Sequence, residues 1–152
     1  MTENLETNIS IEQKEIPLKE VWLVDDQENM IQSLLRFWGM KTSHLGYVFK
    51  YFKTGKEAVE EVEKRKQSRE DLPAIIFMDG NLEKDEGDFQ KGNNVIKDIR
   101  NIAEGEQIKI VAHSATGKMN EEMLNSGADV SFFKNDIVKS RDFLIEQVEP
   151  KD

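Results

Sequence analysis

Four short, mostly apolar runs constrain the fold of this chain more than any other feature of the sequence. They span residues 21–24, 74–78, 108–113 and 129–133, and segments with helical periodicity lie between them. Apolar runs of this length predict buried parallel strands that are covered by helices on both faces. With a further strand expected at residues 47–52, the pattern predicts a doubly wound α/β fold with five strands.

Polar residues follow each of the four runs. Asp25-Asp26 follows the first, Asp79 the second, Ser114-Ala115 the third and Lys134 the fourth. In an open α/β sheet, functional groups gather at the carboxyl ends of the strands. We therefore expect three carboxylates, a hydroxyl and an ammonium to meet in one patch. That set of groups is suited to accepting a phosphoryl group on an aspartate.

The composition limits the class of function. A net charge of -9 argues against non-specific nucleic-acid binding, and the one short basic run, residues 63–66, is expected to be a solvated helix face. The chain has no cysteine and only two histidines, so metal sites built on thiolates or imidazoles are not expected. No stretch approaches the roughly 20 apolar residues of a membrane span, and no signal peptide is visible, which predicts a cytoplasmic protein.

The 152 residues suit a single domain. Residues 1–18 are polar and acidic without clear periodicity, and we expect them to be a flexible leader. The domain is expected at residues 19–149. Because the last predicted helix ends almost at the end of the chain, no output domain is expected.

Five sequence elements occur together in an order typical of a known family. They are Asp25-Asp26 after the first strand, residues 54–58 opening the second helix, Met78-Asp79 ending the third strand, Ser114-Ala115 after the fourth strand, and Gly127-Ala128 followed by Lys134. The chain thereby resembles the receiver domain of bacterial response regulators, in a stand-alone, chemotaxis-type form, from about Glu20 to Val148. The resemblance implies a flavodoxin-like (βα)5 sheet with strand order 2-1-3-4-5.

The resemblance also implies a phosphoacceptor and a metal site. Asp79 would accept the phosphoryl group, and Mg2+ would be the cofactor. Asp26 and Asp79 would bind the ion directly, Asp25 would bind it through water, and the backbone carbonyl of Asn81 would complete the protein ligands.

The remaining family residues would stabilise and report the phosphoryl group. By resemblance, Ser114, Ala115 and Lys134 would contact its oxygens, and Ser114 would pull the loop after the fourth strand. The donor would be a sensor histidine kinase or a histidine phosphotransfer protein, and the signal would pass to an unknown downstream protein. No turnover enzyme, direct nucleic-acid contact or membrane contact is implied.

Three departures from the family pattern stand out. Asn135 follows Lys134, where the family usually has a proline joined by a cis bond. Ser131 occupies the strand position where the family often has a switch aromatic residue, so the read-out at this position is expected to differ. The connection from Gly80 to Gly92 is unusually long and acidic; we expect a mobile surface insertion, with control of access to Asp79 as the alternative.

Two other functions compete with the phosphorylation switch. The first is a binding module that keeps the fold and signals without phosphorylation, which the departures at Ser131 and Asn135 leave open. The second is a Mg2+-dependent phosphohydrolase. No second carboxylate follows Asp79 at a hydrolase-like spacing and the chain has no glycine-rich phosphate loop, so the hydrolase is the weaker alternative.

Overall fold

The computed structural model describes residues 19–147, which form a five-stranded parallel sheet with helices on both faces. The strand order is β2-β1-β3-β4-β5. The strands are β1 (Lys19–Val24), β2 (Tyr47–Phe52), β3 (Ile75–Met78), β4 (Lys109–Ser114) and β5 (Val130–Phe133). The predicted doubly wound fold and its strand order are confirmed. The predicted leader, residues 1–18, lies outside the described residues, as do the last two residues of the predicted domain.

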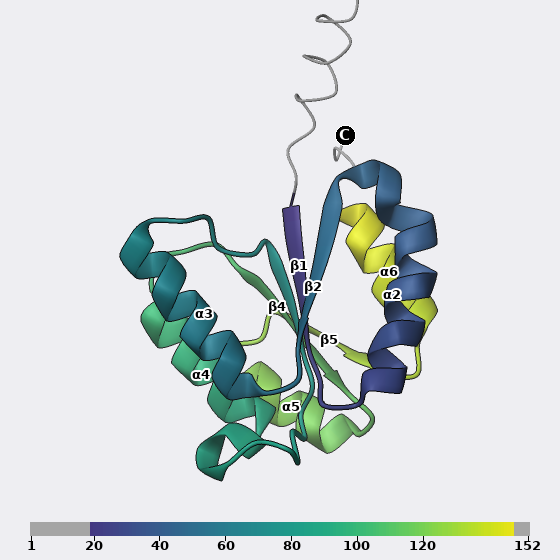
Figure 1. The fold of residues 1–152 in the computed structure, drawn as a ribbon. Coiled ribbons are helices and arrows are strands. Elements are labelled where there is room, and N and C mark those ends of the chain that lie inside the picture. Colours follow the sequence, from purple (N-terminus) through teal and green to yellow (C-terminus); the bar gives the residue numbers. More distant parts are fainter. Residues whose placement is uncertain (1–18, 148–152) are drawn as a thin grey trace, which may run out of the picture.

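Five helices cover the sheet in two layers. They are α2 (Glu28–Thr42), α3 (Gly55–Ser68), α4 (Gly92–Ile102), α5 (Gly117–Asn125) and α6 (Ile137–Glu146), with short 3-10 helices η1 (Ser43–Leu45) and η2 (Gly87–Gln90). Figure 1 shows α2 and α6 side by side on one face of the sheet and α3, α4 and α5 on the other. Within residues 19–147, no helix has both the length and the apolar character needed to cross a bilayer.

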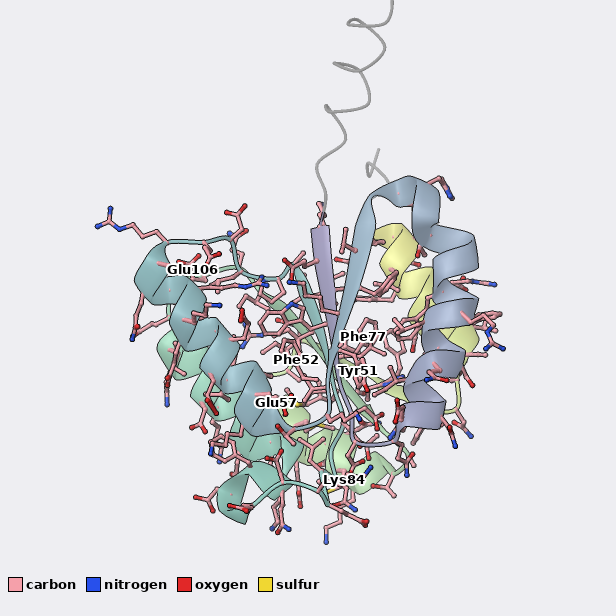
Figure 2. The ribbon with its side chains drawn as sticks, in the orientation of Figure 1. Tyr51, Phe52, Glu57, Phe77, Lys84 and Glu106 are labelled. Atoms are coloured by element: carbon pink, nitrogen blue, oxygen red, sulfur yellow. The ribbon has the colours of Figure 1, made fainter. Side chains whose placement is uncertain are left out.

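The central strands are apolar throughout because both of their faces are covered. In β1, Trp22 and Val24 pack under α3 and α4, whereas Val21 and Leu23 pack under α2 and α6. The same alternation continues in β3 and β4. Figure 2 shows the consequence, with Phe52 on the α3 side of the sheet and Phe77 on the opposite side. Continuous apolar sequence therefore encodes two separate cores, one on each face.

One residue of the basic run in α3 differs from the expectation of a solvated face, whereas Glu63, Lys64 and Lys66 are exposed as expected. Arg65 is buried, and its guanidinium lies 3.0 Å from a carboxylate oxygen of Glu20 in β1 and 3.2 Å from one of Glu61. The guanidinium also lies over the ring of Trp22, 5.2 Å from its centroid. A charge can be buried in this position because two carboxylates pair with it.

Candidate phosphoacceptor site

Three aspartates meet where β1 and β3 end. The backbone N–H of Asp25 donates to the carbonyl of Phe52 (3.0 Å), and the N–H of Asp79 donates to the carbonyl of Val24 (2.9 Å), so the sheet ladder continues into both acidic segments. Asp25, Asp26 and Asp79 are all buried, and each offers a carboxylate oxygen within 4.8 Å of the others. Adjacent parallel strands thus bring together carboxylates that are more than 50 residues apart in sequence.

The ammonium of Lys134 reaches the same cluster from the end of β5. Its Nζ lies 2.7 Å from Oδ2 of Asp25 and 3.1 Å from Oδ2 of Asp79. The side-chain oxygen of Gln27 lies 3.4 Å from the same Nζ. Sequence reasoning missed Gln27, because a glutamine after an acidic pair has no distinguishing signal.

The electrostatics of the cluster follow from its burial. Burial, with the neighbouring Asp25 carboxylate, raises the pKa of Asp79 to about 7, although Lys134 and the N–H of Asn81 act in the opposite direction. Burial alone would lower the pKa of Lys134, but its hydrogen bonds and charge interactions with Asp25 and Asp79 raise that pKa above its ordinary value. The ammonium is therefore charged at neutral pH, while Asp79 needs a further positive charge nearby to remain fully ionised.

Ser114 ends β4 beside these groups and is buried. Its carbonyl accepts the N–H of Lys134 (3.0 Å), and its N–H donates to the side-chain oxygen of Asn120 in α5 (2.9 Å). The amide nitrogen of Asn120 in turn donates to the carbonyl of Phe132 (3.3 Å). Asn120, which sequence reasoning missed, thus joins α5 to the ends of both β4 and β5. A displacement of Ser114 acts directly on this bridge.

An open cavity of about 1340 Å³ lies above the cluster. The predicted site residues that line it are Asp26, Asp79, Asn81, Ser114, Ala115 and Lys134. Among residues 19–147, two of the predicted site residues do not line the cavity. Asp25 lies 2.7 Å from Nζ of Lys134, and Ser131 lies in β5 opposite Ala112 of β4. Thr116, Met119 and Asn135 line the cavity as well.

The connection between β3 and α4, residues 80–92 and called the excursion below, is closed at its base by backbone hydrogen bonds. At its base, the N–H of Gly92 donates to the carbonyl of Gly80 (3.0 Å), Asn81 pairs with Lys91 in an antiparallel bridge, and the N–H of Leu82 donates to the carbonyl of Gln90 (2.8 Å). Leu82 is fully buried in the core under α3 and α4. The expectation of a surface insertion is therefore wrong for part of this segment.

Two further features lie beside the site: the peptide bond after Lys134 and the side chain of His113. Among residues 19–147 no peptide bond is cis, so the Lys134–Asn135 bond is trans. His113 precedes Ser114 in β4 and is buried, edge-on to Phe77 at a centroid distance of 5.4 Å and 3.5 Å from the hydroxyl of Ser140. Burial lowers its pKa to about 3, so it stays neutral.

The donor set fits a divalent cation that prefers oxygen ligands. Three buried carboxylates face one buried ammonium, which leaves an excess of two negative charges when all of them are ionised. Close carboxylates of this kind are stable in their charged forms only beside a cation. Mg2+ and Ca2+ both take carboxylate and carbonyl oxygens, and the open cavity leaves room for the waters that Mg2+ retains.

Comparison with solved structures finds the same fold in several proteins, whereas comparison of the sequence finds no match. No family model and no curated protein matches the sequence. A receiver domain protein (CheY-like) from Methanospirillum hungatei is 17% identical with a TM-score of 0.67, over 87% of this chain and 94% of that chain. One from Methylobacillus flagellatus is 19% identical with a TM-score of 0.67, over 88% and 100%. The receiver domain of a histidine kinase from Arabidopsis thaliana, complexed with Mg2+ and BeF3-, is 20% identical with a TM-score of 0.63, over 85% and 90%.

These likenesses cover nearly all of the described residues and nearly all of each neighbour. They also explain the position of the acidic cluster, since β1 and β3 lie side by side in the shared topology. The fold of the chain is that of the response regulator receiver domains of two-component systems.

Proposed function

We propose that the chain is a receiver domain that accepts a phosphoryl group on Asp79 and signals to a protein partner. The observation that carries the proposal is the buried Asp79 carboxylate, which lines the cavity beside Asp26 and lies 3.1 Å from the Lys134 ammonium. A nucleophile, a positive charge and a hydroxyl donor share one opening at the carboxyl ends of the strands. Phosphoryl transfer depends mainly on such positioning and charge stabilisation.

In the proposed reaction, a carboxylate oxygen of Asp79 attacks the phosphorus of a phosphohistidine or a small acyl phosphate. A new P–O bond forms, the bond from phosphorus to the donor nitrogen or oxygen breaks, and the donor leaves with the bonding electrons. The Lys134 ammonium and the Ser114 hydroxyl are positioned to stabilise the negative charge on the transferred oxygens. The product is a mixed anhydride on Asp79, with no turnover of a substrate.

Mg2+ is the proposed cofactor. Asp26 and Asp79 would hold it directly, Asp25 through water, with the Asn81 carbonyl as a further ligand. When bound, the ion would neutralise charge on the carboxylates and the phosphoryl oxygens. The Arabidopsis receiver domain complexed with Mg2+ and BeF3- supports this assignment by its fold.

Phosphorylation is proposed to act on the protein through Ser114. Attraction of the Ser114 hydroxyl toward the phosphoryl group displaces the end of β4, and the Asn120 bridge carries that displacement to α5 and β5. Because Ser131 has no aromatic ring to reorient, the read-out depends on this bridge. A histidine kinase or phosphotransfer protein would be the donor and a further protein the target; a cytoplasmic location is part of the proposal.

The test is intact mass spectrometry after incubation with Mg2+ and a small acyl phosphate. We expect a phosphoryl adduct on the wild-type protein, which EDTA prevents, and none on Asp79→Asn. Asp71→Asn is the matched control, because Asp71 is exposed and lies outside the phosphoacceptor cavity. Absence of an adduct on the wild type would favour a binding module that works without phosphorylation, and sustained phosphate release would favour a hydrolase.

A further inference from the structure

The excursion between β3 and α4 is anchored to the start of α3 by one buried carboxylate. Asp85 is 7% exposed, and its Oδ2 accepts the backbone N–H of Gly55, the first residue of α3. Burial raises the pKa of the Asp85 carboxyl, and the backbone N–H groups of Gly55, Lys56 and Glu86 act in the opposite direction. Asp85 and Gly55 are 30 residues apart in sequence, so the contact is tertiary.

This contact satisfies groups that a helix start leaves open. The first N–H groups of a helix have no partner within the helix, and the helix dipole favours a negative charge there. In α3, the hydroxyl of Thr54 accepts the N–H of Glu57 (3.1 Å), and Asp85 accepts the N–H of Gly55. The helix start is thereby capped jointly by a residue of its own turn and by the excursion.

The approach is close because Gly55 has no side chain. A Cβ at this position would collide with Val95 and would lie 3.3 Å from Oδ2 of Asp85. A larger residue would therefore first force Val95 of α4 away from the start of α3, and the Asp85 carboxylate would also have to shift slightly. The excursion therefore has a defined position relative to α3.

The residue before Asp85 contacts the acidic cluster. The backbone nitrogen of Lys84 lies 3.4 Å from Oδ2 of Asp26, and Lys84 is one of the residues that line the cavity. Figure 2 shows Lys84 at the end of the molecule opposite Glu106, where the strands end and the phosphoacceptor site lies. The anchored excursion thus supplies a hydrogen-bond donor to a proposed metal ligand.

We propose that Asp85 is a positioning residue: by clamping the excursion to α3 it holds the Lys84 N–H against Asp26 and orients that carboxylate for the divalent cation. This contact between Asp85 and Gly55, called the clamp below, adds a positioning role to the proposed metal site. The identity of the ion as Mg2+ depends on the proposed function. Hydrogen bonds to metal ligands fix ligand orientation, and their loss typically weakens metal binding by about 10–100-fold.

The first test is isothermal titration of Mg2+ into the wild type, Asp85→Ala and Asp88→Ala. Both substitutions remove one negative charge from the same excursion, but Asp88 is exposed. We expect Asp85→Ala to weaken Mg2+ binding by about tenfold and Asp88→Ala to leave it nearly unchanged. An equal effect of the two substitutions, or none from Asp85→Ala, would overturn the proposal.

The second test is amide hydrogen exchange in the absence of Mg2+, which reads the clamp itself. We expect slow exchange at the amides of Gly55, Lys56 and Lys84 in the wild type, and faster exchange at these positions in Asp85→Ala with the β3 amides unchanged. Rapid exchange at Lys84 and Gly55 in the wild type would refute the clamp, even if Asp85→Ala fails to fold. Neither measurement uses the phosphoryl adduct, so a missing adduct on Asp79 would refute the proposed function and leave the clamp standing.

Discussion

The Nζ of Lys134 lies closer to Asp25 than to Asp79, at 2.7 Å against 3.1 Å. The ammonium therefore bridges two of the three carboxylates. Asp26, the third, lines the open cavity and receives the N–H of Lys84. A cation entering the cavity would meet Asp26 and Asp79 first and would compete with Lys134 for the negative charge of the cluster.

From this competition we expect Lys134→Ala to keep Mg2+ binding and to make it a few times tighter. A unit charge about 4 Å away is worth about 1 kcal/mol even in water, and removing a positive charge favours an incoming cation. Isothermal titration of Mg2+ at pH 8 measures the change. Lys139→Ala, at an exposed lysine of α6, is the control. Binding weakened tenfold in Lys134→Ala would show that the ammonium supports the ion rather than competing with it.

The buried Asp79 carboxylate should destabilise the fold at high pH when no cation is bound. The group ionises near pH 3.8 in the unfolded chain, and burial with the charge of Asp25 raises its pKa to about 7 in the folded protein. Between these values the folded state holds more protons than the unfolded state, so stability falls as pH rises. The loss is complete above about pH 7.

We therefore expect Asp79→Asn to be more stable than the wild type at pH 8 in EDTA, by roughly 2–4 kcal/mol, with the difference vanishing toward pH 4. Urea unfolding at both pH values measures it, and Asp71→Asn is the control at an exposed aspartate. Equal stability of Asp79→Asn and the wild type at pH 8 would show that burial of the ionised Asp79 carboxylate does not destabilise the fold.

His113 should act in the opposite direction to Asp79, over a pH range that overlaps the Asp79 range, because its folded-state pKa is lowered rather than raised. Burial lowers its pKa to about 3, while the same side chain in the unfolded chain titrates near its ordinary value of 6.5. Below pH 6.5 the unfolded state takes up a proton that the folded state does not, so stability falls by up to about 1.4 kcal/mol per pH unit until about pH 3. We expect His113→Gln to reduce this slope in urea unfolding. His44→Gln, at an exposed histidine, should keep the wild-type slope.

The sequence predicted the features that depend on local pattern and strand order. The apolar runs of β1, β3 and β4 identified the sheet because their residues face two covered sides. The polar residues after β1, β3 and β5 identified Asp25, Asp26, Asp79 and Lys134 as neighbours. Both inferences need only the general rule that parallel strands end at one edge of the sheet.

Other contacts were missed because they join segments with no shared sequence signal. Asp85 is one of several acids in a polar segment, and only its contact with the start of α3 distinguishes it from exposed Asp88. From sequence alone, Asn120 is indistinguishable from a solvated helix residue. In the structure it is hydrogen-bonded to both Ser114 and Phe132. Arg65 reads as a surface charge because its partner Glu20 is 45 residues away. In each case a polar residue is buried by a partner that the pattern does not reveal.

Gly92 offers a test of how tightly the excursion closes on the phosphoacceptor. A Cβ at Gly92 would collide with the carbonyl oxygen of Asp79 and lie 3.0 Å from Sδ of Met123. The backbone of α4 or of Asp79 must therefore shift in Gly92→Ala, and overpacking of this kind costs about 1–3 kcal/mol. Because Asp79 is displaced, we also expect a smaller yield of phosphoryl adduct.

The matched control is Gly39→Ala in the interior of α2, where a Cβ meets nothing within 4 Å. There the same substitution should stabilise the protein by about 0.5–1 kcal/mol, since alanine favours a helix interior over glycine. Urea unfolding of the two variants should give changes of opposite sign. Gly92→Ala as stable as the wild type would show that the backbone at the base of the excursion can shift at little cost. The close contact between Gly92 and Asp79 would then not fix the position of the excursion beside the phosphoacceptor.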